Sequence, residues 1–156
     1  MMWLLLIAGI AAGDLAIKKY IQENVEENSS KPVLGGHVII TKFYNPGALL
    51  GWMKNQREKM MLMTTSLTGV LVLMTFKTLL APGHGLLKTG YCLLTGGSLS
   101  NVYERVRLKK VTDYFRIVIG GGKLKKLEKV IFNLGDIASF VGALLIMIAE
   151  ILPSKD

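Results

Sequence analysis

Residues 130–152 read VIFNLGDIASFVGALLIMIAEIL, a long apolar run with one aspartate near its start and one glutamate near its end. At about 1.5 Å per helical residue, the stretch from Ile137 to Leu152 spans roughly 24 Å, most of the hydrocarbon thickness of a bilayer. Pro153 follows directly and ends the run. The pattern predicts a transmembrane helix with Asp136 close to one membrane boundary.

Three further apolar blocks precede this one, and nearly all the charge lies between the blocks. We expect four transmembrane helices, approximately at residues 1–20, 60–81, 86–103 and 131–152. Small residues, which allow helices to pack closely, occur in the first block (Gly9 and Gly13) and in the third (Gly90, Gly96 and Gly97). The third block also carries Lys88 and Asn101, so we expect it to contact protein rather than lipid.

The composition supports an integral membrane protein. The chain has 156 residues, of which 51% are hydrophobic, and a net charge of +8 from 19 Lys and Arg against 11 Asp and Glu. Such hydrophobicity excludes a disordered chain and a soluble nucleic-acid-binding module. The length favours one domain covering residues 1–156, and the single cysteine excludes an intramolecular disulfide.

The two longer polar connectors, residues 21–59 and 104–130, share one side of the membrane when the chain crosses four times. Residues 37–43 (HVIITKF) are rich in β-branched side chains and predict a short strand outside the hydrocarbon. Residues 102–115 (VYERVRLKKVTDYF) mix apolar and basic residues, which predicts an interfacial helix. The expected fold is therefore a mainly α membrane protein with a small extracytoplasmic sheet.

Polar residues gather at one end of this predicted bundle: Asp14, Asn101, Asp113 and Asp136. A carboxylate within or beside a transmembrane segment is costly, and it indicates a functional site. Two neighbouring carboxylates share a proton, so one serves as general base and the other as general acid toward a bound water. Attack of that water on a peptide carbonyl is the chemistry of an aspartic peptidase.

Simpler interpretations stand beside this one. Asp14 or Asp136 taken alone is more often a helix cap or a snorkelling residue, and Asp113 alone is more often a solvated loop residue. A small transporter that uses Asp14 and Asp136 in an ion path is a third possibility. Because His37 and His84 fall on opposite sides of the predicted membrane, they cannot form one metal site, and we expect no metal and no cofactor.

Five short motifs resemble those of lipoprotein signal peptidase, also called signal peptidase II, in the order that this family has them. They are Asp14–Lys18 (DLAIK), Asn45–Ala48 (NPGA), Gly96–Arg105 (GGSLSNVYER), Val111–Tyr114 (VTDY) and Phe132–Asp136 (FNLGD). Each motif is weak by itself. Five motifs in order on four matching apolar blocks make a specific resemblance over almost the whole chain.

The resemblance implies four membrane helices, a small extracytoplasmic β-cradle, and an enzyme that cleaves signal peptides from prolipoproteins just before a lipid-modified cysteine. It implies that Asp113 and Asp136 are the catalytic dyad. It also implies supporting or substrate-binding roles for Asp14, Lys18, Asn45, Gly47, Asn101, Glu104, Arg105 and Asn133. Arg105 suits a carboxylate or backbone carbonyls, and the apolar residues 48–53 would clasp the lipid.

The chain departs from the family pattern at three positions. Ser100 replaces a glycine, Glu104 replaces an aspartate, and Gly135 replaces an alanine. The departures at 100 and 104 leave open a non-catalytic homologue that binds lipids or lipoproteins in the membrane.

The resemblance implies a multi-pass protein of the bacterial inner membrane, with its termini and the turn at Pro82 in the cytoplasm and its active site outside. In this orientation 16 of the 19 basic residues lie on the outer side, whereas the positive-inside rule alone predicts the reverse. The expected partners are lipid-modified prolipoprotein signal peptides and membrane lipids, without nucleic acid. We expect the chain to act as a monomer.

Overall fold

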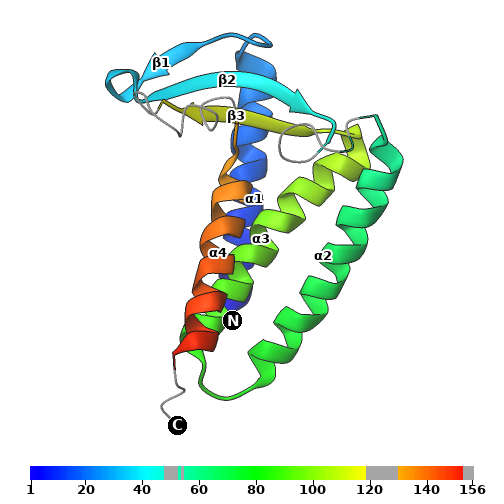
Figure 1. Ribbon diagram of the computed structural model, residues 1–156, viewed down its shortest axis with the longest axis vertical. Coiled ribbons are helices and arrows are strands. Elements are labelled where there is room, and N and C mark those ends of the chain that lie inside the picture. Colours follow the sequence, from blue (N-terminus) through cyan, green and yellow to red (C-terminus); the bar gives the residue numbers. More distant parts are fainter. Residues whose placement is uncertain (48–52, 54, 119–129, 153–156) are drawn as a thin grey trace.

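The computed structural model describes residues 1–47, 53, 55–118 and 130–152. Its four long helices are α1 (Met2–Asn24), α2 (Arg57–Leu80), α3 (Gly85–Leu108) and α4 (Leu134–Ile151). Its strands are β1 (Lys31–Val33), β2 (Val38–Asn45) and β3 (Val111–Ile117), with the single-turn helix η1 (Leu34–Gly36) between the first two. The strands lie across one end of the helices, and the start of α1, the end of α4 and the α2–α3 turn lie at the other (Figure 1).

Each of the four predicted apolar blocks overlaps one of these helices, although several ends differ. The first helix continues to Asn24 and the third to Leu108, four and five residues beyond the predicted ends. The mainly helical architecture with a small sheet is therefore confirmed.

The predicted interfacial helix at residues 102–115 is wrong. Its first half forms the last two turns of α3, which end where Lys109 adopts a left-handed conformation with φ of 58°. Its second half is β3, because the β-branched and aromatic residues from Val111 onward pair with β2. The basic residues that suggested an interfacial helix lie at the junction of these two elements.

The sheet is antiparallel with the order β1-β2-β3, and it confirms the predicted strand at residues 37–43. Asp113 on β3 lies opposite Phe43 on β2. Asn45, two residues beyond Phe43, therefore shares a face of the sheet with Asp113 and lies diagonally from it. This register places an amide beside the first aspartate.

Helix α3 is the central helix and contacts α1, α2 and α4. Its contact with α4 depends on glycines: a Cβ added at Gly142 would lie 2.6 Å from the Gly90 carbonyl oxygen, and one added at Gly97 would overlap the Gly135 carbonyl oxygen. At Gly135, an added Cβ would lie 2.9 Å from the Gly97 carbonyl oxygen, so the alanine of the family pattern is too large for this backbone. The predicted packing role of the third block is confirmed.

Polar side chains are buried and large apolar side chains are exposed, the reverse of the distribution in a soluble protein. Fully buried side chains include those of Asp14, Lys18 and Asn133, whereas many large apolar side chains of α2 and α4 point outward, such as Phe76 and Phe140. Among the described helices, α2 and α4 are long and apolar enough to cross a membrane by length and composition. The outward apolar surface and the polar interior suit a lipid surrounding.

Candidate active site

Asp113 and Asp136 are both held by one residue, Asn133. The Asn133 side-chain amide donates to Asp113 Oδ1 at 2.8 Å, and the Asn133 backbone N–H donates to Asp136 Oδ2 at 3.1 Å. The two aspartates come from β3 and from the first turn of α4, which are separate elements of the fold. Asn133 therefore fixes their carboxylates beside each other.

Asp136 has a helix-capping contact in addition to its place beside Asp113. Asn133 is the N-cap of α4, and its side-chain oxygen accepts from the Asp136 backbone N–H at 2.8 Å. The Asp136 carboxylate returns a bond to the Asn133 backbone, which completes a capping box. The capping bond uses Asp136 Oδ2. The other oxygen, Oδ1, accepts from the Asn101 side chain of α3 at 2.9 Å.

Asp113 is only 3% exposed, and both its carboxylate oxygens accept hydrogen bonds. Oδ1 accepts from Asn133, and Oδ2 accepts from the Asn45 amide at 3.0 Å. Burial, together with the nearby charge of Asp136, raises the pKa of Asp113 to about 7. The solvated-loop interpretation of Asp113 is therefore wrong, because β3 carries its side chain into the interior.

Three asparagine side chains, Asn45, Asn101 and Asn133, present their NH₂ groups to the two carboxylates. Their orientation is fixed because each side-chain oxygen accepts from a group that can only donate, so the NH₂ must point the other way. The three donors are the backbone N–H of Gly47, at 3.0 Å, the Lys18 ammonium, at 2.7 Å, and the backbone N–H of Asp136, at 2.8 Å. The carboxylates thus face oriented donors.

A buried ion pair lies on the α1 side of this site. The Lys18 ammonium lies 2.7 Å from Asp14 Oδ2, and the two side chains are 1% and 0% exposed. Asp14 Oδ1 accepts from the Tyr114 hydroxyl at 3.0 Å. That same hydroxyl accepts from the Leu134 backbone N–H at 2.8 Å, so Tyr114 connects α1 to the start of α4.

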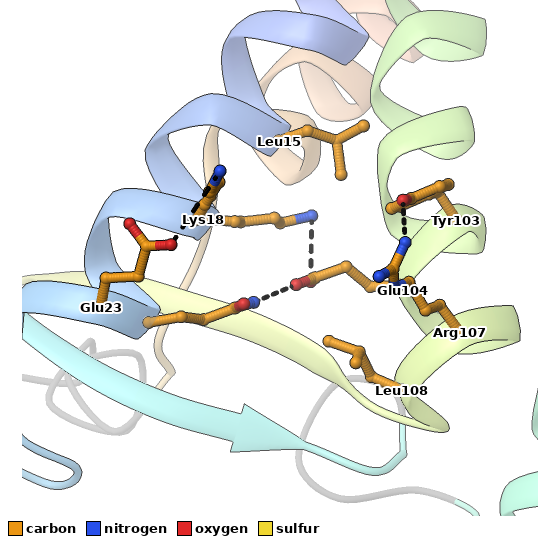
Figure 2. Close-up of a pocket in the computed structure, with 9 residues that line it drawn as sticks. Leu15, Lys18, Glu23, Tyr103, Glu104, Arg107 and Leu108 are labelled. Carbon is orange, nitrogen blue, oxygen red and sulfur yellow. Dashed lines mark hydrogen bonds and ion pairs between the residues drawn. The ribbon is translucent and has the colours of Figure 1, made fainter.

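Glu104 joins α1, α3 and β3. Its carboxylate accepts from the Thr112 backbone N–H at 2.7 Å and from the Thr112 hydroxyl at 2.8 Å, next to Asp113. It also accepts from the Gln22 amide at 2.6 Å. Figure 2 shows Lys18 and Glu104 facing each other between α1 and α3, where a groove of about 430 Å³ opens.

Arg105 is 8% exposed and donates to the Gly47 carbonyl oxygen at 2.7 Å. Of its two expected ligands, the structure therefore gives it a backbone carbonyl. This bond secures the turn after β2, beside the Asn45 amide that reaches Asp113. Most of the apolar stretch expected to clasp lipid, residues 48–53, lies outside the described residues.

All ten residues predicted for the site lie in one connected cluster: hydrogen bonds and the Asp14–Lys18 pair join nine of them, and Glu104 lies 3.6 Å from the Lys18 ammonium. The sequence interpretation missed four more members: Gln22, Ser100, Thr112 and Tyr114. Spacing could have found the first, because Asp14, Lys18 and Gln22 follow each other at intervals of four on one helix face. The described residues contain no group of three or more His, Cys, Asp or Glu side chains placed to hold a metal ion.

Comparison with known proteins matches the sequence of this chain to one family. Residues 6–152 match the family model described as signal peptidase (SPase) II. The lipoprotein signal peptidase of Moorella thermoacetica is 30% identical over 156 residues, covering 100% of this chain and 97% of that protein. The lipoprotein signal peptidase of Bacillus subtilis is 26% identical over 154 residues, covering 99% and 96%.

Solved structures give the same fold. A bacterial membrane enzyme structure at 2.3 Å resolution superposes with a TM-score of 0.81 at 22% identity, covering 96% of this chain and 87% of that chain. A second one, at 1.9 Å resolution, has a TM-score of 0.78 at 21% identity, covering 98% and 94%. At these identities the superpositions establish the arrangement of helices and sheet.

Proposed function

Because this chain belongs to the signal peptidase II family and is therefore a peptidase, we propose that it removes signal peptides from lipid-modified prolipoproteins with Asp113 and Asp136 as its catalytic pair. Its relatives bear the name lipoprotein signal peptidase, which supplies the substrate class. The observation that carries the proposal is the double contact of Asn133, which holds both carboxylates at once. The proposed mechanism is water attack without a covalent intermediate.

In the resting site Asp113 holds the proton that the pair shares, and Asp136 is ionised. Burial and the neighbouring carboxylate bring the pKa of Asp113 to about 7, so it stays largely protonated below neutrality. Asp136 lies in the first turn of α4, where the helix dipole favours an anion, and it accepts from the Asn101 amide and the Asn133 backbone. These differences divide the general acid from the general base.

Cleavage then proceeds in two steps. A water between the carboxylates gives a proton to Asp136 as its oxygen bonds to the peptide carbonyl carbon, while Asp113 gives its proton to the carbonyl oxygen. In the resulting tetrahedral intermediate, Asp136 passes its proton to the peptide nitrogen and the C–N bond breaks. Asp113 takes back a proton from the hydroxyl as the carboxylic acid product forms, which restores the starting state.

In this proposal the substrate lies beside the pair, along the turn secured by Arg105. Arg105 holds the Gly47 carbonyl, and Asn45 reaches Asp113 from the same turn. A signal peptide in extended form along this turn presents the bond before its lipid-modified cysteine to the two aspartates. The lipid lies against outward apolar side chains of the neighbouring helices.

All four helices span the bacterial inner membrane in this proposal, and residues 1–156 act as one domain and as a monomer. The sheet and the catalytic pair then face the extracytoplasmic side, opposite the α2–α3 turn (Figure 1). A reporter fused to the C-terminus tests the orientation. Activity of a reporter that works only in the cytoplasm is expected, and activity of one that works only outside would reverse the topology.

The direct test of the function uses purified full-length protein with a precursor that carries a diacylglyceryl cysteine. We expect mass spectrometry to find one cut, directly before the modified cysteine, and no cut in the same precursor without lipid. Binding of the lipid-modified precursor without cleavage would overturn the proposal in favour of the non-catalytic homologue. A cut at another bond would overturn the proposed specificity.

A further inference from the structure

Ser100 stands where the family pattern has a glycine, and it is fully buried between α1 and α3. Its hydroxyl donates to Asp14 Oδ2 and accepts from the Lys18 ammonium at 3.0 Å. Hydroxyls within helices commonly bond to the carbonyl four residues earlier, as those of Thr75 and Thr89 do in this chain. The partners of Ser100 are instead two charged side chains of the neighbouring helix.

The Ser100 hydroxyl is one of three acceptors around the Lys18 ammonium. The other two are Asp14 Oδ2 and Asn101 Oδ1, each at 2.7 Å. An ammonium group has three N–H donors, so these three acceptors use all of them. A fourth oxygen, Glu104 Oε2, lies 3.6 Å from the ammonium and carries a negative charge.

Glu104 is the second departure of the α3 motif, since the family pattern has an aspartate there. Its side chain is one methylene longer than aspartate, and its carboxylate already accepts from Thr112 beside Asp113. The Lys18 ammonium therefore has two alternative partners. One is Asn101, which donates to Asp136, and the other is Glu104, which accepts from Thr112. A shift of Lys18 toward Glu104 would release the Asn101 oxygen and free its amide to turn away from Asp136.

We propose that Ser100 is a positioning residue that compensates for the longer side chain of Glu104. By completing the set of three acceptors, its hydroxyl keeps the Lys18 ammonium on Asn101, and Asn101 then keeps its NH₂ on Asp136 Oδ1. The inference rests on the proposed role of Asp136 and adds two residues that act through others. It predicts that positions 100 and 104 depend on each other.

The test compares four proteins: the wild type, Ser100→Gly, Glu104→Asp, and the double variant. In Ser100→Gly we expect turnover of the lipid-modified precursor to fall about three- to tenfold, because the hydroxyl that bonds to both Lys18 and Asp14 is lost and the Lys18 ammonium is held less firmly on Asn101. The acidic limb of its pH–rate profile moves up by roughly half a pH unit, since a carboxylate with a loosened donor holds its proton to higher pH. The double variant returns to within about threefold of the wild type, because the shortened carboxylate withdraws from Lys18.

Thr75→Val is the matched control, since it removes a buried hydroxyl of similar size from the Thr75–Thr95 bond between α2 and α3. It leaves the acidic limb in place even where it lowers stability. A Ser100→Gly profile with an unmoved acidic limb would overturn the proposal and assign Ser100 a purely structural role. Additive losses in the double variant would overturn the compensation.

The hydrogen bond from Asn101 to Asp136 can also be tested without turnover. NMR on protein labelled at asparagine measures how fast the Asn101 side-chain amide protons exchange with solvent. We expect faster exchange in Ser100→Gly than in the wild type, and slower exchange again in the double variant. Equal exchange in all three would contradict the inference. A wild type that cleaves nothing would count against the proposed function, while this measurement still decides the positioning role.

Discussion

Near the two aspartates, helix α3 packs against α1 and against α4 in different ways. Toward α1 it presents charged and hydroxyl side chains, with Ser100 and Glu104 around the buried Lys18–Asp14 pair. Toward α4 it presents bare backbone, with Gly97 against Gly135. Beside the two aspartates, hydrogen bonds specify the contact with α1 and close approach specifies the contact with α4. Farther along α3 the contact with α1 is close as well, since a Cβ added at Gly96 would lie 3.0 Å from the Ile7 carbonyl oxygen.

The proposed catalytic pair, Asp113 and Asp136, lies where these two contacts meet. Asp136 enters from α4, and the close approach at Gly97 brings it within reach of the Asn101 amide of α3. Lys18 enters from α1 and fixes how that amide is turned. The glycine contact therefore sets the distance between donor and carboxylate, and the polar contact sets the orientation of the donor.

The largest effect is expected from Lys18→Met, which removes the cation of the polar contact while keeping its bulk. Asp14 is then left as an unpaired buried charge, so the free energy of unfolding should fall by about 3–5 kcal/mol. Reversible unfolding in detergent measures the loss. Asp14→Asn in the same background should recover part of it, and a double variant less stable than Lys18→Met would show that the pair is not the cause.

A smaller loss is expected at the glycine contact. Gly97→Ala places a methyl group against the Gly135 carbonyl, and relieving that overlap should cost about 1–3 kcal/mol and separate α3 from α4. Gly9→Ala, which meets open space in α1, serves as the control and should lose no stability, since alanine favours a helix over glycine by up to about 1 kcal/mol. If Gly97→Ala is as stable as Gly9→Ala, the close contact between α3 and α4 does not contribute to stability as proposed.

A change of pH tests the proposed catalytic pair, which lies between the two helix contacts. With the pKa of Asp113 raised to about 7, raising the pH from 6 to 8 should lower turnover about tenfold, because the acid loses the proton that it donates. The protonated form is favoured by folding, so stability from Asp113 is present at acidic pH and declines as the pH rises toward 7. Asp113→Asn should abolish that decline in pH-dependent unfolding.

The smallest effect on stability is expected from a change at Lys19, the residue next to Lys18. Lys19 forms an exposed pair with Glu23 at 4.0 Å, and the two side chains are 75% and 60% exposed. Because solvent screens such a pair, Lys19→Met should change stability by less than about 1 kcal/mol. A loss as large as that of Lys18→Met would mean that burial does not distinguish the two lysines.

Much of this arrangement could be predicted from the sequence, because the main signals are local. The apolar blocks predicted the helices, and the four-residue spacing of Asp14 and Lys18 follows one helix face. The β-branched run at residues 37–43 predicted part of β2. Glycines in the third block correctly indicated a contact with protein, whereas Gly9 and Gly13 have no neighbour within 4 Å of an added Cβ.

The missed features depend on partners that are distant in the chain. β3 reads locally as a basic amphipathic segment, and it is a strand because β2, about 70 residues earlier, pairs with it. Ser100 and Gln22 look like ordinary helix residues until α1 and α3 are brought together. The orientation of the Asn101 amide follows from Lys18 on α1, which no local pattern contains, whereas Asn45 and Asn133 accept from donors two and three residues ahead.

The central claim, that Asp113 and Asp136 form the catalytic pair, is tested most directly by single-turnover cleavage with Asp113→Asn and Asp136→Asn. Glu23→Gln, which removes an exposed carboxylate, is the matched control. We expect each aspartate variant to lose at least about 10³-fold in rate, because neither amide can take the role of acid or base, while the control keeps the wild-type rate. Wild-type cleavage by either aspartate variant would contradict the account.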